Sequence, residues 1–179
     1  MKQYISLLRG INVGGHRRII MADLKAMCIK IGFKNPMTYI QSGNISFESK
    51  LSDIEKIESL MSKAILKTFG HEVPVLVKSI SEFNSILKNN PFLTDTIDTK
   101  KLHITFLSSV PSLTDLNNLN TLRFENDSFI VNKDVIYLNI ENPYHKTKLS
   151  NQFFEKKLNV SMTTRNWKTA NKIVELASS

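Results

Sequence analysis

MTYIQSGNISFE, residues 37–48, holds two short runs of alternating apolar and polar residues on either side of Ser42 and Gly43. A two-residue connection that contains glycine between such runs is typical of a β-hairpin. Taken literally, this turn places Tyr39 opposite Ser46 across the two strands. The hairpin is the feature from which the rest of the fold can be predicted.

Side chains alternate between the two faces of a strand, so the hairpin has two distinct faces. We expect the face turned to the core to carry Ile40, Ile45 and Phe47. The opposite, polar face then carries Tyr39, Gln41, Asn44 and Ser46.

The segments around the hairpin complete a repeating order of strands and helices. Residues 3–8 form an apolar run typical of a strand, and residues 22–33 have the apolar spacing of a helix. After the hairpin, Ser52 and Glu55 have the spacing of a helix capping box, and residues 73–77 form another apolar run. The predicted order is βαββαβ, which is that of ferredoxin-like domains.

The same order begins again after residue 100. Strands are predicted at 102–107, 127–131, 134–140 and 160–164, and helices at 112–119 and 148–158. Further helices are predicted at 81–88 and 166–177. We therefore predict an α+β protein, a tandem duplication of ferredoxin-like (βαββαβ) subdomains with antiparallel sheets and an extra C-terminal helix. The expected division is 1–78 for the first subdomain, 79–100 for a connecting helix and loop, and 101–179 for the second.

The chain is basic, with a formal net charge of +8 and a pI of about 9.6 over 179 residues. Such a charge favours anionic partners, for example nucleic acid, nucleotides or phosphorylated metabolites. The alternative is that the charge serves only solubility. The single cysteine, Cys28, excludes an internal disulfide and a cysteine-based zinc site.

No apolar run approaches the roughly 18 residues of a membrane span, and the N-terminus has no secretory signal pattern. We therefore expect a cytoplasmic protein with no membrane partner.

Three motifs together resemble a known family: LLRGINVGG at 7–15, TYIQSGNISFES at 38–49 and TTRNWKT at 163–169. They are similar to a bacterial family of unknown function whose members open with LLRGINVGG. The resemblance implies a duplicated ferredoxin-like fold and a small cytoplasmic bacterial protein. It implies no established activity, cofactor or catalytic residue.

The segment from Leu7 to Met21 is the first candidate site, because glycines and arginines gather in it. Glycine backbone can form an anion-binding nest, and arginine adds charge-assisted hydrogen bonds. The spacing fits neither a P-loop nor a dinucleotide fingerprint. The predicted ligand-binding residues of this segment are Arg9, Asn12, Gly14, Gly15 and Arg17. The alternative is a tight structural turn whose arginines are solvated.

Two further candidates extend this site. Gln41 and Asn44, on the polar face of the hairpin, could hydrogen-bond a ligand near Arg9, or could pack against another part of the chain. Between Pro143 and Lys172 there are seven lysines or arginines and one acidic residue, and Arg165 is the predicted ligand-binding residue among them.

Catalysis finds less support. His16 and His145 could transfer protons, but the sequence shows no nucleophile elbow and no metal-ligand spacing, so neither a metal nor a cofactor is predicted. Three functions remain open: binding of an anionic ligand, an enzyme acting on such a ligand, and a protein-interaction module. RNA recognition by stacked aromatics is not favoured, since Phe47 is expected on the core face.

Overall fold

The computed structural model describes residues 1–141 and 143–178 and divides into two compact units. The first unit comprises Met1–Ser85 together with the C-terminal residues from Asn171 onward, and the second comprises Ile86–Ala170. The boundary between the units therefore falls inside one helix near residue 85 and inside another near residue 170.

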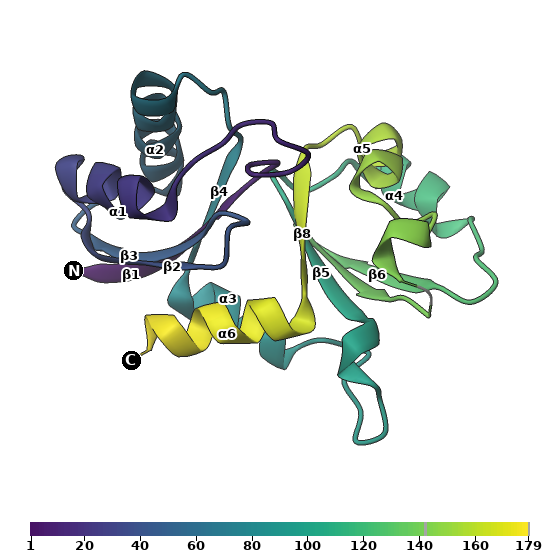
Figure 1. Cartoon of the computed structure of the whole chain (residues 1–179). Helices are drawn as coiled ribbons and strands as arrows, with labels where there is room; N and C mark the ends of the chain where they lie inside the picture. The colour runs from purple at the N-terminus through teal and green to yellow at the C-terminus, as the bar shows by residue number, and fades with distance from the viewer. Residues whose placement is uncertain (142, 179) are drawn as a thin grey trace. The chain divides into compact units, whose positions relative to one another are not determined.

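The elements of the first unit are β1 (Lys2–Leu8), α1 (Met21–Lys30), β2 (Lys34–Tyr39), β3 (Asn44–Ser49), α2 (Ile54–Phe69) and β4 (Val75–Ser79) (Figure 1). Those of the second are β5 (Leu102–Leu107), α4 (Leu113–Asn120), β6 (Ser128–Asn132), β7 (Val135–Asn139), α5 (Asn151–Leu158) and β8 (Met162–Asn166). Two helices span the unit boundaries, α3 (Ile80–Lys88) and α6 (Trp167–Ala177). Short 3-10 turns lie at Thr99–Lys101 and Tyr144–Lys146.

Each unit contains one four-stranded sheet whose neighbouring strands are all antiparallel. The strand order is β2-β3-β1-β4 in the first sheet and β6-β7-β5-β8 in the second. Corresponding strands occupy corresponding positions in the two sheets. The first strand of each βαββαβ unit, β1 or β5, is one of the two central strands. The predicted duplication of a ferredoxin-like fold is confirmed.

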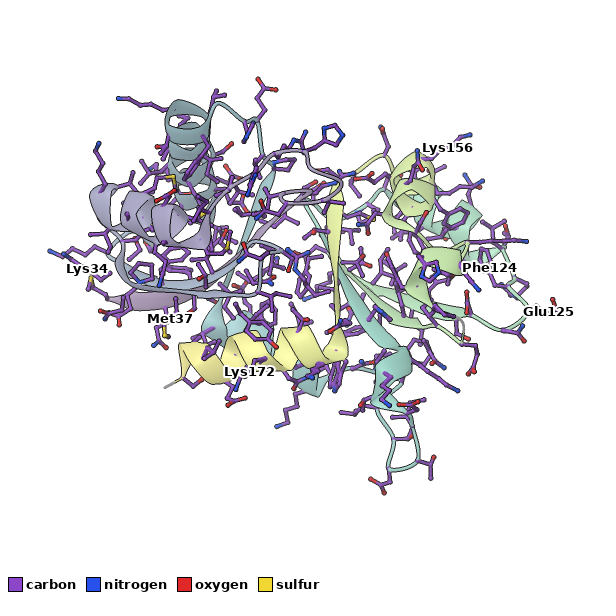
Figure 2. All side chains as sticks on the ribbon, in the orientation of Figure 1. Lys34, Met37, Phe124, Glu125, Lys156 and Lys172 are labelled. Atoms are coloured by element: carbon purple, nitrogen blue, oxygen red, sulfur yellow. The ribbon has the colours of Figure 1, made fainter. Side chains whose placement is uncertain are left out.

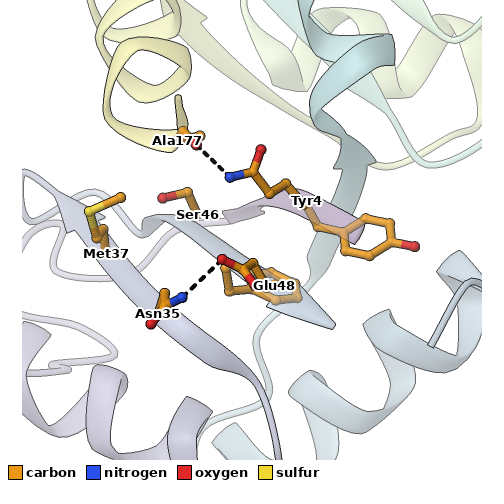
Figure 3. A pocket seen from close by; sticks show the side chains of 8 residues that line it. Tyr4, Asn35, Met37, Ser46, Glu48 and Ala177 are labelled. Carbon is orange, nitrogen blue, oxygen red and sulfur yellow. Dashed lines mark hydrogen bonds between the residues drawn. The ribbon is translucent and has the colours of Figure 1, made fainter. Parts of the chain in front are cut away.

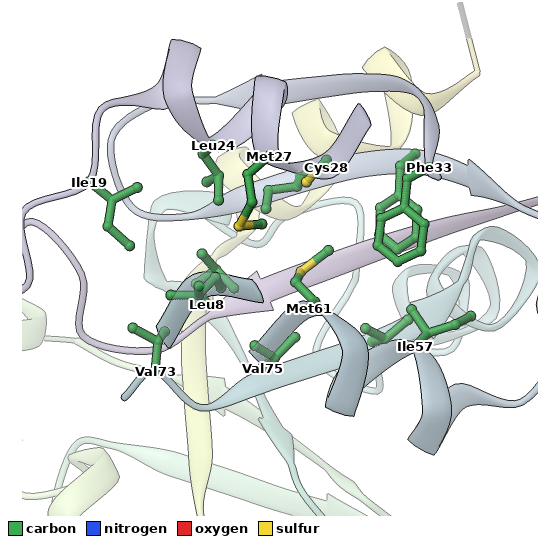
Figure 4. Close-up of a cluster of buried hydrophobic side chains, with 14 of the residues drawn as sticks. Leu8, Ile19, Leu24, Met27, Cys28, Phe33, Ile57, Met61, Val73 and Val75 are labelled. Atoms are coloured by element: carbon green, nitrogen blue, oxygen red, sulfur yellow. The ribbon is translucent and has the colours of Figure 1, made fainter. Parts of the chain in front are cut away.

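Helices α1 and α2 cover one face of the first sheet and enclose its core (Figure 4). Leu24, Met27 and Cys28 of α1 meet Ile57 and Met61 of α2 there. Burial raises the pKa of the Cys28 thiol to about 12, so this cysteine serves as a small apolar core residue. The second unit has an equivalent core, which includes Leu107, Leu138, Phe154 and Leu158.

The hairpin between β2 and β3 differs from the prediction in its turn. Tyr39 pairs with Asn44 and Met37 with Ser46, so the connection has four residues, 40–43. Ile40 lies in this connection with a left-handed φ of 51° and is 50% exposed, and its predicted place on the core face is wrong. The register moves by two residues, which preserves the alternation of faces. Tyr39, Asn44 and Ser46 consequently share one face, as predicted.

Two other boundaries are corrected by local hydrogen bonding. The N-cap of α2 is Asp53 and not Ser52, since the Asp53 carboxylate accepts a hydrogen bond of 3.1 Å from Lys56 N. The turn between β6 and β7 is Lys133–Asp134 and not Asn132–Lys133, because Asn132 pairs with Val135. Ser112, the first residue of the predicted helix at 112–119, is the N-cap of α4.

The C-terminal part of α6 belongs to the first unit, which differs from the expected division at residues 101–179. Gln3 Nε2 donates a hydrogen bond of 2.9 Å to the backbone oxygen of Ala177. Ile173 and Ala177 are buried on this helix, and Trp167 at its start is half-buried.

Candidate functional site

The segment between β1 and α1 is fixed at both ends by buried isoleucines. Ile11 and Ile19 are each 1% exposed, while the residues from Val13 to Arg18 are exposed. We call residues 9–20 the basic loop. Its exposed part is therefore a short projection whose two ends are held by side chains buried in the core.

Within the basic loop, Gly14 and Gly15 form the tip of a miniature hairpin. Val13 and His16 pair across the tip, and His16 N donates a hydrogen bond of 3.0 Å to Val13 O. The two glycines have φ values of 58° and 79°, and two successive positive φ values are what a type I′ turn requires. The turn conformation thus accounts for the two glycines. They do not lie at the N-terminus of α1, which begins only at Met21.

The side-chain amide of Asn12 ties the basic loop to its surroundings. Its Nδ2 donates hydrogen bonds of 2.9 Å to Ile19 O and to Gln41 O, and its Oδ1 accepts one of 2.8 Å from Ile19 N. Both polar atoms of the amide are thereby used within the protein. Asn12 has a φ of 55°, a conformation that asparagine tolerates better than most residues.

A second contact joins the β2–β3 turn to β1. Leu8 N donates a hydrogen bond of 2.8 Å to Gly43 O. A Cβ on Gly43 would lie 2.6 Å from Leu8 Cβ and 2.9 Å from Ile11 Cδ1, and Gly43 has a φ of 74°. Only glycine fits this approach, so the turn and the basic loop form one connected structure.

The predicted hairpin residues have their polar atoms partly engaged in the same structure. Asn44 is buried, and its Nδ2 donates to Tyr39 O at 3.0 Å and to Ser42 Oγ at 2.9 Å. Gln41 is exposed, and its backbone oxygen accepts the hydrogen bond from Asn12. The structure brings Asn12 and Gln41 together, and ligand binding by these residues stays a prediction.

The arginines of the basic loop differ in their surroundings. Arg9 is half-buried, and its backbone N–H donates a hydrogen bond of 3.0 Å to Pro74 O. Arg17 is exposed, and its Nη1 lies 3.3 Å from the position that a Cβ of Gly10 would occupy. Arg18 is also exposed, but it does not line the pocket that Arg17 lines.

That pocket is a hollow of about 400 Å³ between the basic loop, α2 and the segment that leads from α2 into β4. Its lining consists of Arg17, Ser62, Lys63, Leu66, Glu72, Val73 and Pro74. We call it the Arg17 pocket. Ser62 Oγ donates a hydrogen bond of 3.3 Å to Val73 O, which leaves the hydroxyl oxygen able to accept. Lys63 and Ser62 were not predicted from the sequence, because nothing in the pattern of α2 separates them from other solvent-facing helix positions.

Arg165 belongs to the second unit, where it lies on β8 and is only 8% exposed. Its Nη1 donates hydrogen bonds of 2.7 Å to Thr163 Oγ1 and 2.9 Å to Thr164 O. Burial lowers the pKa of its guanidinium to about 10. These contacts give Arg165 a structural role within its own strand, and its predicted role in ligand binding stays untested.

Another hollow, of about 280 Å³, opens at the sheet of the first unit beside the end of α6 (Figure 3). Met37, Ser46, Glu48 and Ala177 contribute to its lining. Asn35 Nδ2 donates a hydrogen bond of 2.9 Å to Glu48 Oε1 there. Among the described residues that line this hollow, Glu48 is the only charged one, so an anion is better matched by the Arg17 pocket.

The histidines considered for proton transfer are not part of a metal-ligand cluster. Within residues 1–141 and 143–178, no three histidine, cysteine or acidic side chains lie close enough to hold a metal ion. His16 is exposed beside the Gly14–Gly15 turn, and His145 is exposed in the second unit.

Residues 1–137 match a protein-family model described as a protein of unknown function, DUF1697. The chain belongs to this family. A comparison with curated proteins finds no match. Among solved structures, the chain is similar to the conserved bacterial protein SP0830 from Streptococcus pneumoniae. That similarity has a TM-score of 0.76 at 24% sequence identity and covers 98% of each chain. It bears on the fold alone, which this DUF1697 member shares over 98% of its length. No helix in the described part of the chain is long and apolar enough to cross a membrane.

Proposed function

We propose that the protein binds a phosphate-bearing small molecule at the Arg17 pocket. The observation that carries the proposal is the convergence of Arg17 and Lys63 on one hollow of about 400 Å³. Two cationic side chains in a concave site can bind a phosphate group through charge-assisted hydrogen bonds.

The basic loop supports this proposal because its hydrogen bonds fix the backbone that carries Arg17. The Gly14–Gly15 turn, the Asn12 amide and the hydrogen bond of 3.3 Å from Asn12 N to Arg17 O together fix the backbone on both sides of the hairpin. A cationic side chain on a fixed backbone loses less conformational entropy on binding than one on a mobile loop. In this proposal the glycines shape the loop, and Arg17 and Lys63 contact the anion.

Glu72 lines the same pocket and limits what can bind. Its carboxylate repels a ligand that is anionic throughout, and it attracts a hydrogen-bond donor. A ligand with a phosphate at one end and an amino or hydroxyl group at the other matches this lining.

The test is a titration of the full-length protein with inorganic phosphate, pyrophosphate and adenosine monophosphate, followed by isothermal calorimetry and amide chemical shifts. We expect Arg17→Gln and Lys63→Gln each to weaken binding about tenfold, the effect of roughly 1.4 kcal/mol. Arg18→Gln is the matched control, because Arg18 neighbours Arg17 and is exposed but does not line the pocket. Equal losses for the Arg17 and Arg18 variants, or no binding of any probe, would contradict the proposal.

Nucleic-acid binding is the second form of the anionic-ligand hypothesis, and the same variants separate it from the first. A backbone-binding surface uses every exposed cation, so Arg18→Gln would weaken binding as much as Arg17→Gln. Affinity for a duplex oligonucleotide would then also fall steeply with salt.

A further inference from the structure

The two sheets have four edge strands. Three of them carry a feature that either interrupts the strand or provides a hydrogen-bond partner for a backbone group at the edge. An exposed edge strand is otherwise a template for pairing with another chain. β2 contains Pro36 and a break in its register between Lys34 and Met37, residues that Figure 2 labels. Val77 N on β4 donates a hydrogen bond of 2.8 Å to Glu58 Oε1, a carboxylate of α2.

β8 has the equivalent device in the second unit. Met162 N donates a hydrogen bond of 3.1 Å to Glu155 Oε1 of α5. In each half of the duplication, then, a glutamate of the second helix covers a backbone donor of the fourth strand. Such a repeated arrangement indicates that unprotected edges matter for this fold.

β6 is different, because its sequence SFIVN contains no charge, no proline and no glycine. Its three central residues, Phe129, Ile130 and Val131, have high β-propensity, and an uncharged apolar run of this kind is what an edge strand normally avoids. Ile130, at its centre, is 41% exposed, and Ser128 and Asn132 on either side of it are exposed too.

The turn at Lys133–Asp134 fixes which backbone groups of β6 point outward. In a two-residue hairpin the residues that flank the turn, here Asn132 and Val135, form a hydrogen-bonded pair. Backbone groups alternate along an antiparallel strand, so those of Phe129 and Val131 face away from β7. Within the described residues, these outward groups have no hydrogen-bond partner.

The sequence of β6 with its two flanking residues, DSFIVNK from Asp127 to Lys133, is complementary to itself in the antiparallel direction. When a second copy of this segment is aligned antiparallel to the first, with Ile130 opposite Ile130, Phe129 lies opposite Val131 of the second copy. Phe129 and Val131 are the residues whose backbone groups face outward. The same alignment brings Asp127, the residue before the strand, to the end at which Lys133 begins the β6–β7 turn of the second copy. Both the hydrogen-bonding register and the charges therefore agree on one alignment.

We propose that β6 is a docking edge for a second copy of this chain, which pairs antiparallel to it about a twofold axis at Ile130. The pairing joins the two β6-β7-β5-β8 sheets into one continuous eight-stranded sheet. The pairing needs no contribution from the Arg17 pocket, so this proposal can be tested independently of the proposed ligand binding. A twofold contact of this kind uses the same patch on both partners.

The side chains on both faces of β6 fit this arrangement. Ile130 meets its counterpart across the axis, where residues of a non-hydrogen-bonded pair approach to about 4.5 Å between Cα atoms. On the other face, Phe129 contacts Phe154 with ring centroids 5.4 Å apart and extends the core to the edge. Phe124, in the loop before β6, packs beside it with centroids 6.0 Å apart.

Asp127 is held at the start of the strand by its own contacts. Its Oδ1 accepts a hydrogen bond of 3.0 Å from Glu141 N, and its Oδ2 accepts one from Thr147 Oγ1. A carboxylate has about four lone-pair sites, so Lys133 of a second copy can still bind it.

A five-residue strand buries less than the roughly 800 Å² per partner of a stable dimer. We therefore expect a dimer that forms as the protein concentration rises, and that can be trapped by a covalent bond.

The test is cysteine cross-linking along β6, because the proposed register makes a different prediction at each position. Ile130→Cys lies on the axis and should form a disulfide-linked dimer under mild oxidation. Ser128→Cys and Asn132→Cys should each fail alone, since equivalent residues then lie about 13 Å apart. A mixture of those two variants should cross-link, because residues 128 and 132 face each other. The buried Cys28 does not interfere.

A non-covalent measurement accompanies the cross-linking. By sedimentation equilibrium we expect the unmodified chain to dimerise with concentration, and Ile130→Lys to weaken the association at least tenfold by placing two ammonium groups together. Ile130→Thr keeps a β-branched, uncharged residue and is the matched control. A chain that stays monomeric at all concentrations would overturn the proposal, as would Ser128→Cys linking alone as readily as Ile130→Cys.

Discussion

The side-chain amide of Asn12 donates a hydrogen bond of 2.9 Å to the backbone oxygen of Gln41, and so joins the basic loop to the β2–β3 turn. The same amide group binds both backbone atoms of Ile19, at the other end of the loop. Two motifs that stand 29 residues apart in the sequence are thereby held together by one asparagine. The position of Arg17 depends on this connection, since Asn12 also pairs with it through the backbone.

Replacing Asn12 tests that role. We expect Asn12→Ala to destabilise the first unit by about 1–3 kcal/mol, because three hydrogen bonds are lost and the positive φ becomes unfavourable. Asn12→Gly is the control, since it removes the amide but tolerates the backbone conformation. The specific readout is amide hydrogen exchange at Ile19, whose N–H donates to Asn12 Oδ1. Unchanged protection of Ile19 in both variants would show that the amide does not hold the loop.

Gly43 provides a sharper steric prediction. A methyl group there would meet Leu8 Cβ at 2.6 Å, a distance that both backbones must move to relieve. We expect Gly43→Ala to cost about 2–5 kcal/mol from overpacking and the positive φ together. Gly70→Ala is the control, because Gly70 has a similar φ of 71° with nothing within 4 Å of the added methyl. Denaturant unfolding should show that the Gly43 variant loses at least twice as much stability as the Gly70 variant.

The order of elements was predictable from the sequence because periodicity and turn residues report it directly. The partners of particular polar atoms were not predictable. The role of Asn12 in ligand binding stays a prediction, but no sequence pattern shows that its side-chain amide reaches Gln41 O, because that contact is tertiary. The length of the β2–β3 turn was missed for a related reason, since an isoleucine at positive φ contradicts its own local preference. The place of Lys63 in the pocket lining was not predicted, because Arg17 and α2 come together only in the tertiary structure.

His103 gives the second unit a pH dependence whose direction is fixed. Burial lowers the pKa of its imidazole in the folded state, although a hydrogen bond with Lys101 O opposes this, and Tyr144 stacks on the ring with centroids 4.8 Å apart. The unfolded state, with a pKa near 6.5, therefore binds a proton at higher pH than the folded state does. The His103 contribution is fully present above about pH 6.5 and is lost as the pH falls through the folded pKa.

Urea unfolding between pH 7.5 and pH 5 should accordingly show a decreasing free energy of unfolding, and His103→Gln should remove part of that decrease. The glutamine is uncharged throughout this range, which makes it a suitable reference. An identical pH profile for both proteins would exclude His103 as the source.

Ile40 is the residue whose backbone conformation conflicts most with its side chain. It has a φ of 51°, and a β-branched residue in the left-handed region costs about 1–2 kcal/mol. Because the side chain is half exposed, little packing would be lost on replacement. We expect Ile40→Asn or Ile40→Gly to raise the free energy of unfolding of the first unit by about 1 kcal/mol. Ile40→Val keeps the β-branch and should give no gain. The opposite outcome is that the asparagine and glycine variants are less stable while the valine variant is unchanged. The exposed isoleucine would then make a contact that offsets its backbone strain.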